Sequence, residues 1–232
     1  MILKICGITN QADATAAIQA GATAVGFNFY PRSPRYIAPE QAAEILSAKG
    51  VLRVGVFVNE PRGRVEEIAR IARLDVAQLH GDEPPADYPH AGGTACATTT
   101  GPAFSEVGQA VPPALHSSSR SGVPAVWKAL RVGATFDIAL YCDDPAEALL
   151  LDGPAAGLYG GAGHTFDWRL VRATNKRIVL AGGLDASNVA TAIELVRPWG
   201  VDACSRIESA PGKKDHGKMN DFLQAAKAAA RS

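Results

Sequence analysis

Lys4-Ile5-Cys6-Gly7-Ile8-Thr9-Asn10 is a short apolar run that ends in a cysteine, turns through a glycine and reaches two residues suited to capping a helix. The pattern predicts a buried strand with a thiol at its carboxyl end, followed at once by a helix. In a barrel of alternating strands and helices, the catalytic groups collect at that end of the strands. Cys6 is therefore a candidate base or nucleophile, although a cysteine with apolar neighbours is more often a small core residue.

The same alternation of an apolar run and a helical pattern recurs eight times along the chain. The expected strands are 3–6, 22–29, 52–58, 76–80, 126–130, 148–152, 177–181 and 200–205. Runs that are apolar on both faces, such as 54–58, are typical of buried parallel strands. Eight such units in 232 residues predict an α/β protein, an eight-stranded parallel (β/α)8 TIM barrel that forms a single domain over residues 1–232. The structural alternative is an open doubly wound sheet, but the turn after the first strand lacks the G-x-G-x-x-G pattern usual there.

Local signals mark several helix ends. Thr9 or Asn10 is suited to cap the first helix, and Gly21 to end it. Asp185 precedes an apolar stripe of helical spacing over 189–196. One connection is unusually long: residues 81–125 join strands four and five, and the part from 89 to 124 is rich in Gly, Ala, Ser, Thr and Pro. Such a segment is either a poorly ordered insertion or an active-site lid, and only 104–111 favours a short helix.

Composition excludes several classes of function. The formal net charge is zero, so nothing suggests binding to nucleic acid or to an acidic membrane surface. No apolar run approaches the ~18 residues that a membrane span requires, and no cleavable leader is evident. The four cysteines, Cys6, Cys96, Cys142 and Cys204, are far apart, which favours free thiols over disulfides or a zinc site. A cytoplasmic protein with a small-molecule partner is expected.

Polar residues gather at the expected carboxyl ends of the strands. They are Cys6, Arg35, Asn59, His80, Lys128, Asp152, Gly182, Gly183, Asp202 and Ser205. Gly182 and Gly183 follow strand seven, and the loop 204–209 follows strand eight beside them. This fold commonly binds phosphate at that place through backbone N–H groups. The alternative is that the glycines only make the turns tight.

Two of these residues suit acid and base chemistry. Asp152 ends an apolar run and precedes a glycine-rich stretch, so partial withdrawal from water would help its carboxyl group to keep a proton and donate it near neutrality. Cys6 needs only a modest push toward the thiolate to act as a base. An acid and a base over a phosphate anchor suit the isomerisation of a sugar phosphate.

Blocks along nearly the whole chain resemble one enzyme family. They are 4–9 (KICGIT), 55–59 (GVFVN), 78–83 (QLHGDE), 160–163 (GGAG) with 166–168 (FDW), and 210–215 (APGKKD). Together, in this order, they resemble phosphoribosylanthranilate isomerase of tryptophan biosynthesis. The resemblance implies a TIM barrel that converts N-(5'-phosphoribosyl)anthranilate to 1-(2-carboxyphenylamino)-1-deoxyribulose 5-phosphate by an Amadori rearrangement without a cofactor or a metal.

The resemblance also implies roles for single residues. Asp152 would be the general acid that opens the ribose ring, and Cys6 the general base that takes the C2′ proton. Arg35 would hold the anthranilate carboxylate, a task suited to a guanidinium fork, and His80 and Asp202 would line the substrate site. Gly182, Gly183, Ser205 and Arg206 are the candidate phosphate-binding residues.

The chain departs from the family pattern in three places. The family pattern at 204–206 resembles Ser-Ser-Gly, and Arg206 stands in place of its glycine. If the backbone there is left-handed, a side chain at this position would cost about 1–2 kcal/mol. The expectation is that Arg206 weakens substrate binding more than the chemical step, although its guanidinium could also contact phosphate. Ala162, where the family has a small hydroxyl residue, is a milder change. The 81–125 insertion is the third.

Three rival functions stay open from the sequence. The first is another phosphate-binding barrel enzyme, such as an epimerase, for which metal-ligating histidines would be expected at several strand ends. The second is a barrel that binds phosphorylated ligands with impaired or lost catalysis, owing to Arg206 and the 81–125 insertion. The third is a thiol sensor that uses Cys6 and Cys204. The oligomeric state is expected to be a monomer or a homodimer.

Overall fold

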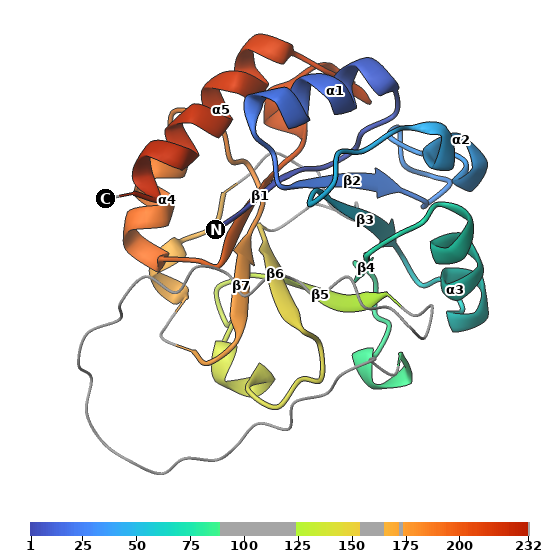
Figure 1. Ribbon diagram of the computed structural model, residues 1–232. Helices are drawn as coiled ribbons and strands as arrows, with labels where there is room; N and C mark the ends of the chain where they lie inside the picture. Colours follow the sequence, from blue (N-terminus) through green and yellow to red (C-terminus); the bar gives the residue numbers. More distant parts are fainter. Residues whose placement is uncertain (89–123, 154–164, 172–173, 232) are drawn as a thin grey trace.

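Eight parallel strands close into a barrel. The computed structural model describes residues 1–88, 124–153, 165–171 and 174–231. The strands are β1 (Ile2–Ile5), β2 (Ala24–Asn28), β3 (Leu52–Phe57), β4 (Val76–Leu79), β5 (Ala125–Arg131), β6 (Ala148–Asp152), β7 (Arg177–Leu180) and β8 (Gly200–Ala203). Each strand pairs with the next, and β8 returns to β1 (Figure 1). The predicted TIM barrel is confirmed.

Several expected strands end earlier than the apolar runs indicated. Cys6, His80 and Ala181 each lie one residue beyond the last residue of their strand, and Cys204 does so after β8. Backbone hydrogen bonds still hold some of them to the neighbouring strand, such as the one from Cys6 N to Ala203 O at 2.9 Å. These residues therefore form a rim above the barrel with well-defined backbone positions.

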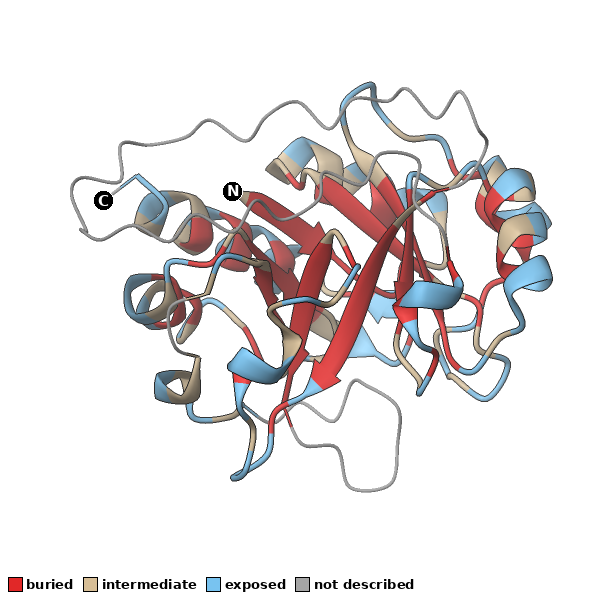
Figure 2. Cartoon of the chain, turned by 90° about the horizontal axis from the view of Figure 1, so that it is seen from below, coloured by how far each residue is buried: buried red, intermediate tan, exposed pale blue. Residues whose placement is uncertain are grey.

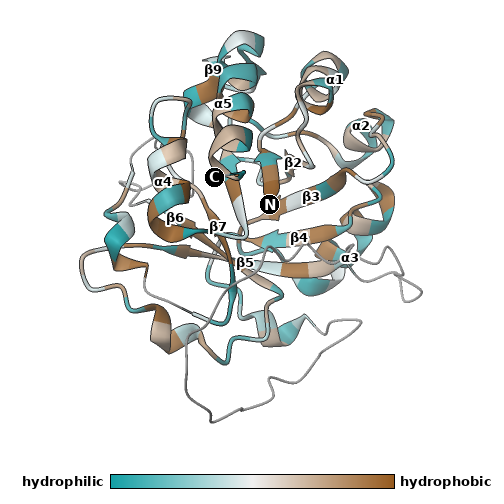
Figure 3. Ribbon diagram, turned by 60° about the vertical axis from the view of Figure 1, so that its left-hand side comes forward, coloured by the Kyte–Doolittle hydropathy of each residue, from teal (hydrophilic) through white to brown (hydrophobic). Residues whose placement is uncertain are grey.

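The alternation of side chains along the strands divides the core into two clusters. The inner cluster fills the barrel with Ile2, Ala24, Val54, Val76, Trp127, Ala129, Ala148, Leu150, Val179 and Ala181. The outer cluster lies between the strands and the helices and contains alternate residues such as Leu3 and Ile5. Buried residues follow the strands in Figure 2, and hydrophobic residues follow the strands and the inward helix faces in Figure 3.

Five α-helices cover the barrel in the described part of the chain. They are α1 (Gln11–Ala20), α2 (Pro39–Glu44), α3 (Arg62–Ile71), α4 (Val189–Val196) and α5 (His216–Ala229). Asn10 caps α1 through the backbone N–H of Asp13, and Gly21 ends it with φ 96°, as predicted. The N-cap residue of α4 is Asn188, whose side chain makes no capping hydrogen bond. Asp185, which precedes the apolar stripe, accepts hydrogen bonds from Ser187 in the turn before the helix.

The expectation of a helix after every strand is wrong for the connection from β5 to β6. Residues 132–147 contain only a short 3₁₀ turn, η2 (Ile138–Tyr141). Asp137 caps this turn through the N–H of Ala139, and Pro145 cannot donate the backbone hydrogen bond that a longer helix needs. The short turns η1 (Pro85–Asp87) and η3 (Trp168–Leu170) lie in the two neighbouring connections. The helix expected over 104–111 and most of the 81–125 connection lie outside the described residues.

A small hairpin joins β8 to α5. It consists of the turn η4 (Ser205–Ile207), β9 (Glu208–Ala210) and β10 (Lys213–Lys214), with β9 and β10 antiparallel. Gly212 has φ 80° at the tip, and Thr9 Oγ1 donates a hydrogen bond of 2.6 Å to its carbonyl oxygen. The hairpin thereby ties the end of the chain to the loop after β1. None of the helices in the described ranges is both long and apolar enough for a membrane span.

Candidate active site

A cavity of about 460 Å³ opens at the carboxyl ends of the strands. Its lining includes all nine residues proposed from the sequence for the site: Cys6, Arg35, His80, Asp152, Gly182, Gly183, Asp202, Ser205 and Arg206. These residues come from strands and loops spread over 200 positions of the chain, so only barrel closure brings them together. The structure brings them together in one place, and their individual roles stay predictions.

A buried ion pair lies directly below Cys6. Lys4 Nζ is 2.7 Å from Asp202 Oδ2, and the lysine side chain is fully buried. Burial opposes the charged ammonium, but the Asp202 carboxylate and the Cys6 thiolate outweigh it and raise the pKa of Lys4. Burial also raises the pKa of Asp202 to about 7, because Lys4 only partly offsets the loss of water. Asp202 Oδ1 is buried without a partner in the described part of the structure.

Cys6 is held in an environment that favours its thiolate. The side chain of Cys204 hydrogen-bonds to it and, together with the positive charges of Lys4 and Lys214, lowers the pKa of Cys6 well below its usual value against the opposing effect of burial. The pKa of Cys204 is raised in turn, by that same hydrogen bond and by burial. The pair therefore carries its proton on Cys204, and Cys6 is poised to accept one.

Asp152 is positioned across the cavity from Cys6 by a histidine. His80 Nε2 lies 3.3 Å from Asp152 Oδ2, and both side chains are about one-tenth exposed. His80 Nδ1 is 3.0 Å from the amide nitrogen of Gln78. Because an amide nitrogen only donates, Nδ1 accepts and the ring proton stays on Nε2, which points to Asp152. One carboxyl oxygen of Asp152 is thus oriented by His80, and the other is available to a ligand.

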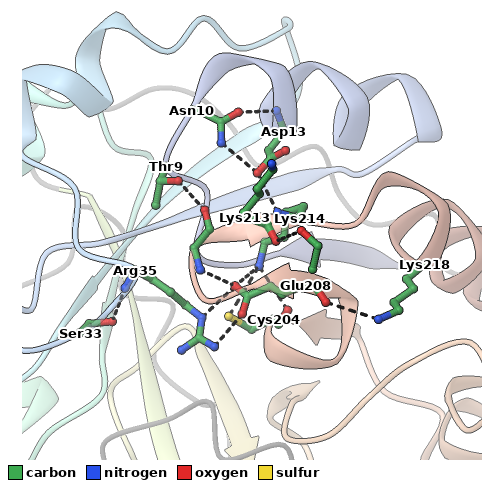
Figure 4. A network of polar contacts seen from close by, with 12 residues as sticks. Thr9, Asn10, Asp13, Ser33, Arg35, Cys204, Glu208, Lys213, Lys214 and Lys218 are labelled. Carbon is green, nitrogen blue, oxygen red and sulfur yellow. Dashed lines mark hydrogen bonds and ion pairs between the residues drawn. The ribbon is translucent and has the colours of Figure 1, made fainter.

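Arg35 is fixed by a network beneath the hairpin (Figure 4). Its Nε and Nη2 donate to the two carboxylate oxygens of Glu208 at 2.9 and 2.7 Å. Lys214 Nζ donates to the same carboxylate at 2.9 Å and to Cys204 O at 3.2 Å. Burial opposes the charges, but these contacts raise the pKa of Arg35 and lower that of Glu208. The fork expected to take a substrate carboxylate is therefore occupied on its Nε–Nη2 edge, which leaves the Nη1 end for a ligand.

The glycine loop after β7 has the expected open backbone. Gly182 and Gly183 have φ values of 80° and 61°, and the Asn188 side chain donates to Gly183 O at 2.8 Å. Ser205 and Arg206 lie beside this loop in η4. Arg206 Nε is 3.5 Å from Asp185 Oδ2, and the arginine side chain is half exposed.

The expectation of left-handed strain at Arg206 is wrong. Among the described residues other than glycine, positive φ occurs at Asn59, Arg73 and Arg197 only. The 3₁₀ turn of η4 keeps Arg206 in an ordinary backbone region, so no steric cost attaches to the side chain there. Ala162, the milder departure, lies outside the described residues.

Three residues that shape the site were not among the predicted site residues. Lys4 was identifiable, because it is two positions before Cys6 and therefore faces the same side of the strand. Glu208 and Lys214 carried no such signal, since their contacts depend on how the β9–β10 hairpin folds over Arg35. Within the described residues, no group of three or more His, Cys, Asp or Glu side chains is arranged to hold a metal ion.

A closed (β/α)8 barrel whose mouth combines a thiol of lowered pKa, a carboxyl group and a glycine loop beside cationic groups is typical of an acid–base isomerase or lyase of phosphorylated ligands. Comparison with known proteins narrows this class. The family model of N-(5'-phosphoribosyl)anthranilate isomerase matches residues 3–105 and 108–225. The chain belongs to this family, and it is an isomerase.

Individual relatives agree over almost the full length. The chain is 63% identical over 229 residues to the N-(5'-phosphoribosyl)anthranilate isomerase of Solibacter usitatus (strain Ellin6076), covering 99% of this chain and 98% of that protein. A solved phosphoribosylanthranilate isomerase in complex with reduced 1-(o-carboxyphenylamino)-1-deoxyribulose 5-phosphate is 35% identical, with a TM-score of 0.72 and coverage of 98% and 100%. Monomers generated from the dimeric enzyme of Thermotoga maritima give the same four values.

Proposed function

We propose that this protein converts N-(5'-phosphoribosyl)anthranilate to 1-(2-carboxyphenylamino)-1-deoxyribulose 5-phosphate in tryptophan biosynthesis. The observation that carries the proposal is that Cys6, whose pKa is lowered, and Asp152 line one cavity together with Arg35, Arg206 and the glycine loop. The family match supports the same reaction.

Asp152 acts first, as the general acid. Its proton goes to the ring oxygen of the ribose, the bond from C1′ to that oxygen breaks, and the anilinic nitrogen forms an iminium with C1′. His80 donates to one carboxyl oxygen, so the other is directed to the substrate. Ring opening requires protonation because an alkoxide is a poor leaving group.

Cys6 then acts as the general base. Once the iminium exists, the hydrogen on C2′ is acidic, and the thiolate removes it to give an enolamine. The enolamine tautomerises to the ketone product, so the sum of the steps is an isomerisation. Cys204 and Lys4 support this role because they keep Cys6 deprotonated.

The remaining groups bind the ends of the substrate. Arg35 receives the anthranilate carboxylate on its Nη1 end while Glu208 holds the opposite edge. The partnerless Oδ1 of Asp202 takes a sugar hydroxyl, since a buried polar atom gains most from a new partner. The N–H groups around Gly182, Gly183 and Ser205 bind the phosphate.

Arg206 adds positive charge beside the phosphate loop. Because the backbone of Arg206 is not strained, its guanidinium is free to attract the phosphate. The side chain thereby takes over the contact that an open glycine backbone would make. We therefore expect Arg206→Gly to raise KM about three- to tenfold, as for one partly exposed charge-assisted contact, with kcat within twofold. Steady-state kinetics measure both constants, and a variant with an unchanged KM would exclude the contact.

Turnover by the purified protein tests the function itself. Freshly generated substrate should lose its anthranilate fluorescence on addition of enzyme, with product formation checked by mass. The rival with a specific feature behind it is a barrel that binds without turnover, because Arg206 and the insertion depart from the family pattern. Binding of a reduced product analogue with no loss of substrate would establish that rival.

Three further statements belong to the proposal. The chain forms one catalytic domain over residues 1–232, the site of action is the cytoplasm, and the protein is a monomer or a homodimer. Free thiols at Cys6, Cys142 and Cys204 support a reducing compartment. The dimeric Thermotoga maritima relative makes light scattering the direct measurement of the oligomeric state.

A further inference from the structure

Cys6 and Cys204 lie side by side at the mouth of the barrel. The register of β1 and β8 pairs Lys4 with Asp202 and Ile5 with Ala203, and the ladder continues through the hydrogen bond from Cys6 N to Ala203 O. One step further, this register places Cys6 opposite Cys204. Cys6 and Cys204 each lie two residues after a member of the Lys4–Asp202 pair. Because side chains alternate along a strand, the two cysteine side chains point to the same inner side as that pair.

This arrangement meets the geometric requirement for a disulfide. Paired positions on adjacent parallel strands are roughly 4.8 Å apart, and disulfides join Cα atoms roughly 4.4–6.8 Å apart. The two side chains interact closely enough for each to shift the pKa of the other. From this spacing, the bond closes by rotation of the side-chain torsions.

The sulfur atoms of Cys6 and Cys204 have glycines beside them, without side chains to cover them, and both cysteines line the cavity. Glycines flank both: a Cβ on Gly26 would lie 2.9 Å from Cys6 Sγ, and one on Gly7 would lie 3.1 Å from Cys204 Sγ. Both cysteines line the open cavity, so a small oxidant can reach them. Lys214 Nζ, 3.9 Å from Cys204 Sγ, stabilises negative charge on either sulfur.

We propose that Cys6 and Cys204 form a reversible redox site, in which a peroxide converts the two thiols to a disulfide that blocks the active site. The Cys6 thiolate attacks one oxygen of hydrogen peroxide, the O–O bond breaks, and Cys6 becomes a sulfenic acid, while the leaving hydroxide takes from solvent the proton that Cys6 had released and becomes water. Cys204 then attacks the Cys6 sulfur, its proton and the leaving hydroxyl form a second water, and the S–S bond closes. In sum, two thiols and one peroxide give one disulfide and two waters.

The disulfide removes the base, Cys6, from the proposed reaction. The same bond protects Cys6 from irreversible oxidation. A sulfenic acid that has no neighbouring thiol proceeds to the irreversible sulfinic acid under further peroxide. Cys204 captures Cys6 before that step, and a dithiol reductant restores both groups. The bond itself is detected by mass, so its formation is measured independently of whether Cys6 is the base.

The test uses a Cys96→Ser/Cys142→Ser variant of the full chain, in which Cys6 and Cys204 are the remaining thiols. Treatment with a small molar excess of hydrogen peroxide should reduce the thiol count from two to zero, lower the intact mass by about 2 Da for the two hydrogens lost, and join the two cysteine peptides. Activity should fall at least tenfold and return after dithiothreitol. Adding Cys204→Ser to this background should instead give mass gains of oxygen atoms on Cys6, with activity loss that dithiothreitol does not reverse.

Two results would overturn the proposal. Mass gains of oxygen without a joined peptide in the two-thiol variant would show that the pair does not close, whatever the activity. A joined peptide with activity retained would show that the bond does not block the site, and it would also remove Cys6 from the role of base. Turnover that is normal before oxidation, combined with the first result, leaves the proposed function intact.

Discussion

The buried Lys4–Asp202 pair makes a prediction about stability that changes with pH. In the structure the two side chains meet at 2.7 Å with 0% and 7% exposure. Replacing Lys4 by Met keeps a chain of similar length but leaves the Asp202 carboxyl without its cation. Removing one partner of a buried pair typically costs about 3–5 kcal/mol, and we expect a loss of this size in the free energy of unfolding at pH 8.

The pH dependence follows from the raised pKa of Asp202, which is about 7 in the folded parent protein. When the pKa of a group is higher in the folded than in the unfolded protein, the group contributes its full stabilisation at pH values below the unfolded-state pKa. This contribution is lost as the pH rises through the folded-state pKa. In the parent protein that loss is complete just above pH 7. Without Lys4 the folded pKa is higher still, so the variant continues to lose about 1.4 kcal/mol per pH unit above pH 7.

Urea unfolding of the parent and the variant between pH 6 and 9 measures the difference. The matched control is the double variant Lys4→Met/Asp202→Asn, which removes both charges and with them the titration of Asp202. The single variant should diverge from this control as the pH rises above 7. A constant difference between them, or a cost of Lys4→Met below about 1 kcal/mol at pH 8, would show that Lys4 does not stabilise the buried Asp202 carboxylate.

Two further substitutions address the positions of Cys6 and Arg35. In Gly26→Ala the added Cβ would lie 2.9 Å from Cys6 Sγ and 3.1 Å from its Cα, so the base must shift and kcat should fall about 100-fold. The matched control is Gly63→Ala, where nothing lies within 4 Å of the added Cβ. Equal kcat values in the two variants would contradict the role of Cys6 as the base. Glu208→Gln keeps the shape of the Arg35 partner and removes its charge, so KM should rise about tenfold because a charge-assisted contact is roughly twice as strong as a neutral one. Here kcat should change by less than threefold, and a fall in kcat alone would show that Glu208 acts on the chemical step.

The barrel was predictable because its determinants are local. Each strand is a short apolar run with its own flanking turn, and Asn10 and Gly21 end α1 through contacts within a few residues. The helix expected after β5 does not form, since the stretch is held by the Asp137 cap and interrupted by Pro145. Propensity alone did not reveal that this connection can cover the barrel with a single turn.

The composition of the site was predictable, but its internal contacts were not. Polar residues that follow most of the strands mark the cavity lining, because all parallel strands end at the same rim. Asn59 and Lys128 are the exceptions: they are not among the lining residues, and Lys128 Nζ donates instead to the carbonyl oxygens of Gly81 and Glu83. The contact between Cys6 and Cys204 depends on closure of the barrel between its first and last strands. The two hydrogen bonds from Arg35 to Glu208 depend on the β9–β10 hairpin. No pattern in the sequence specifies the position of this hairpin. The side chain of Arg206 is tolerated because η4 is a 3₁₀ turn, which the substitution itself does not indicate.

Cys6 as the base and Asp152 as the acid have separate roles in the proposed reaction, and one assay measures the contribution of each. The loss of substrate fluorescence is followed for the parent, Cys6→Ser and Asp152→Asn at neutral pH, after circular dichroism has shown that all three are folded. Removal of either a general acid or a general base costs about 10²–10⁴-fold in rate, so kcat should fall by at least 100-fold in each variant. Either variant with kcat within tenfold of the parent would contradict the role assigned to its residue.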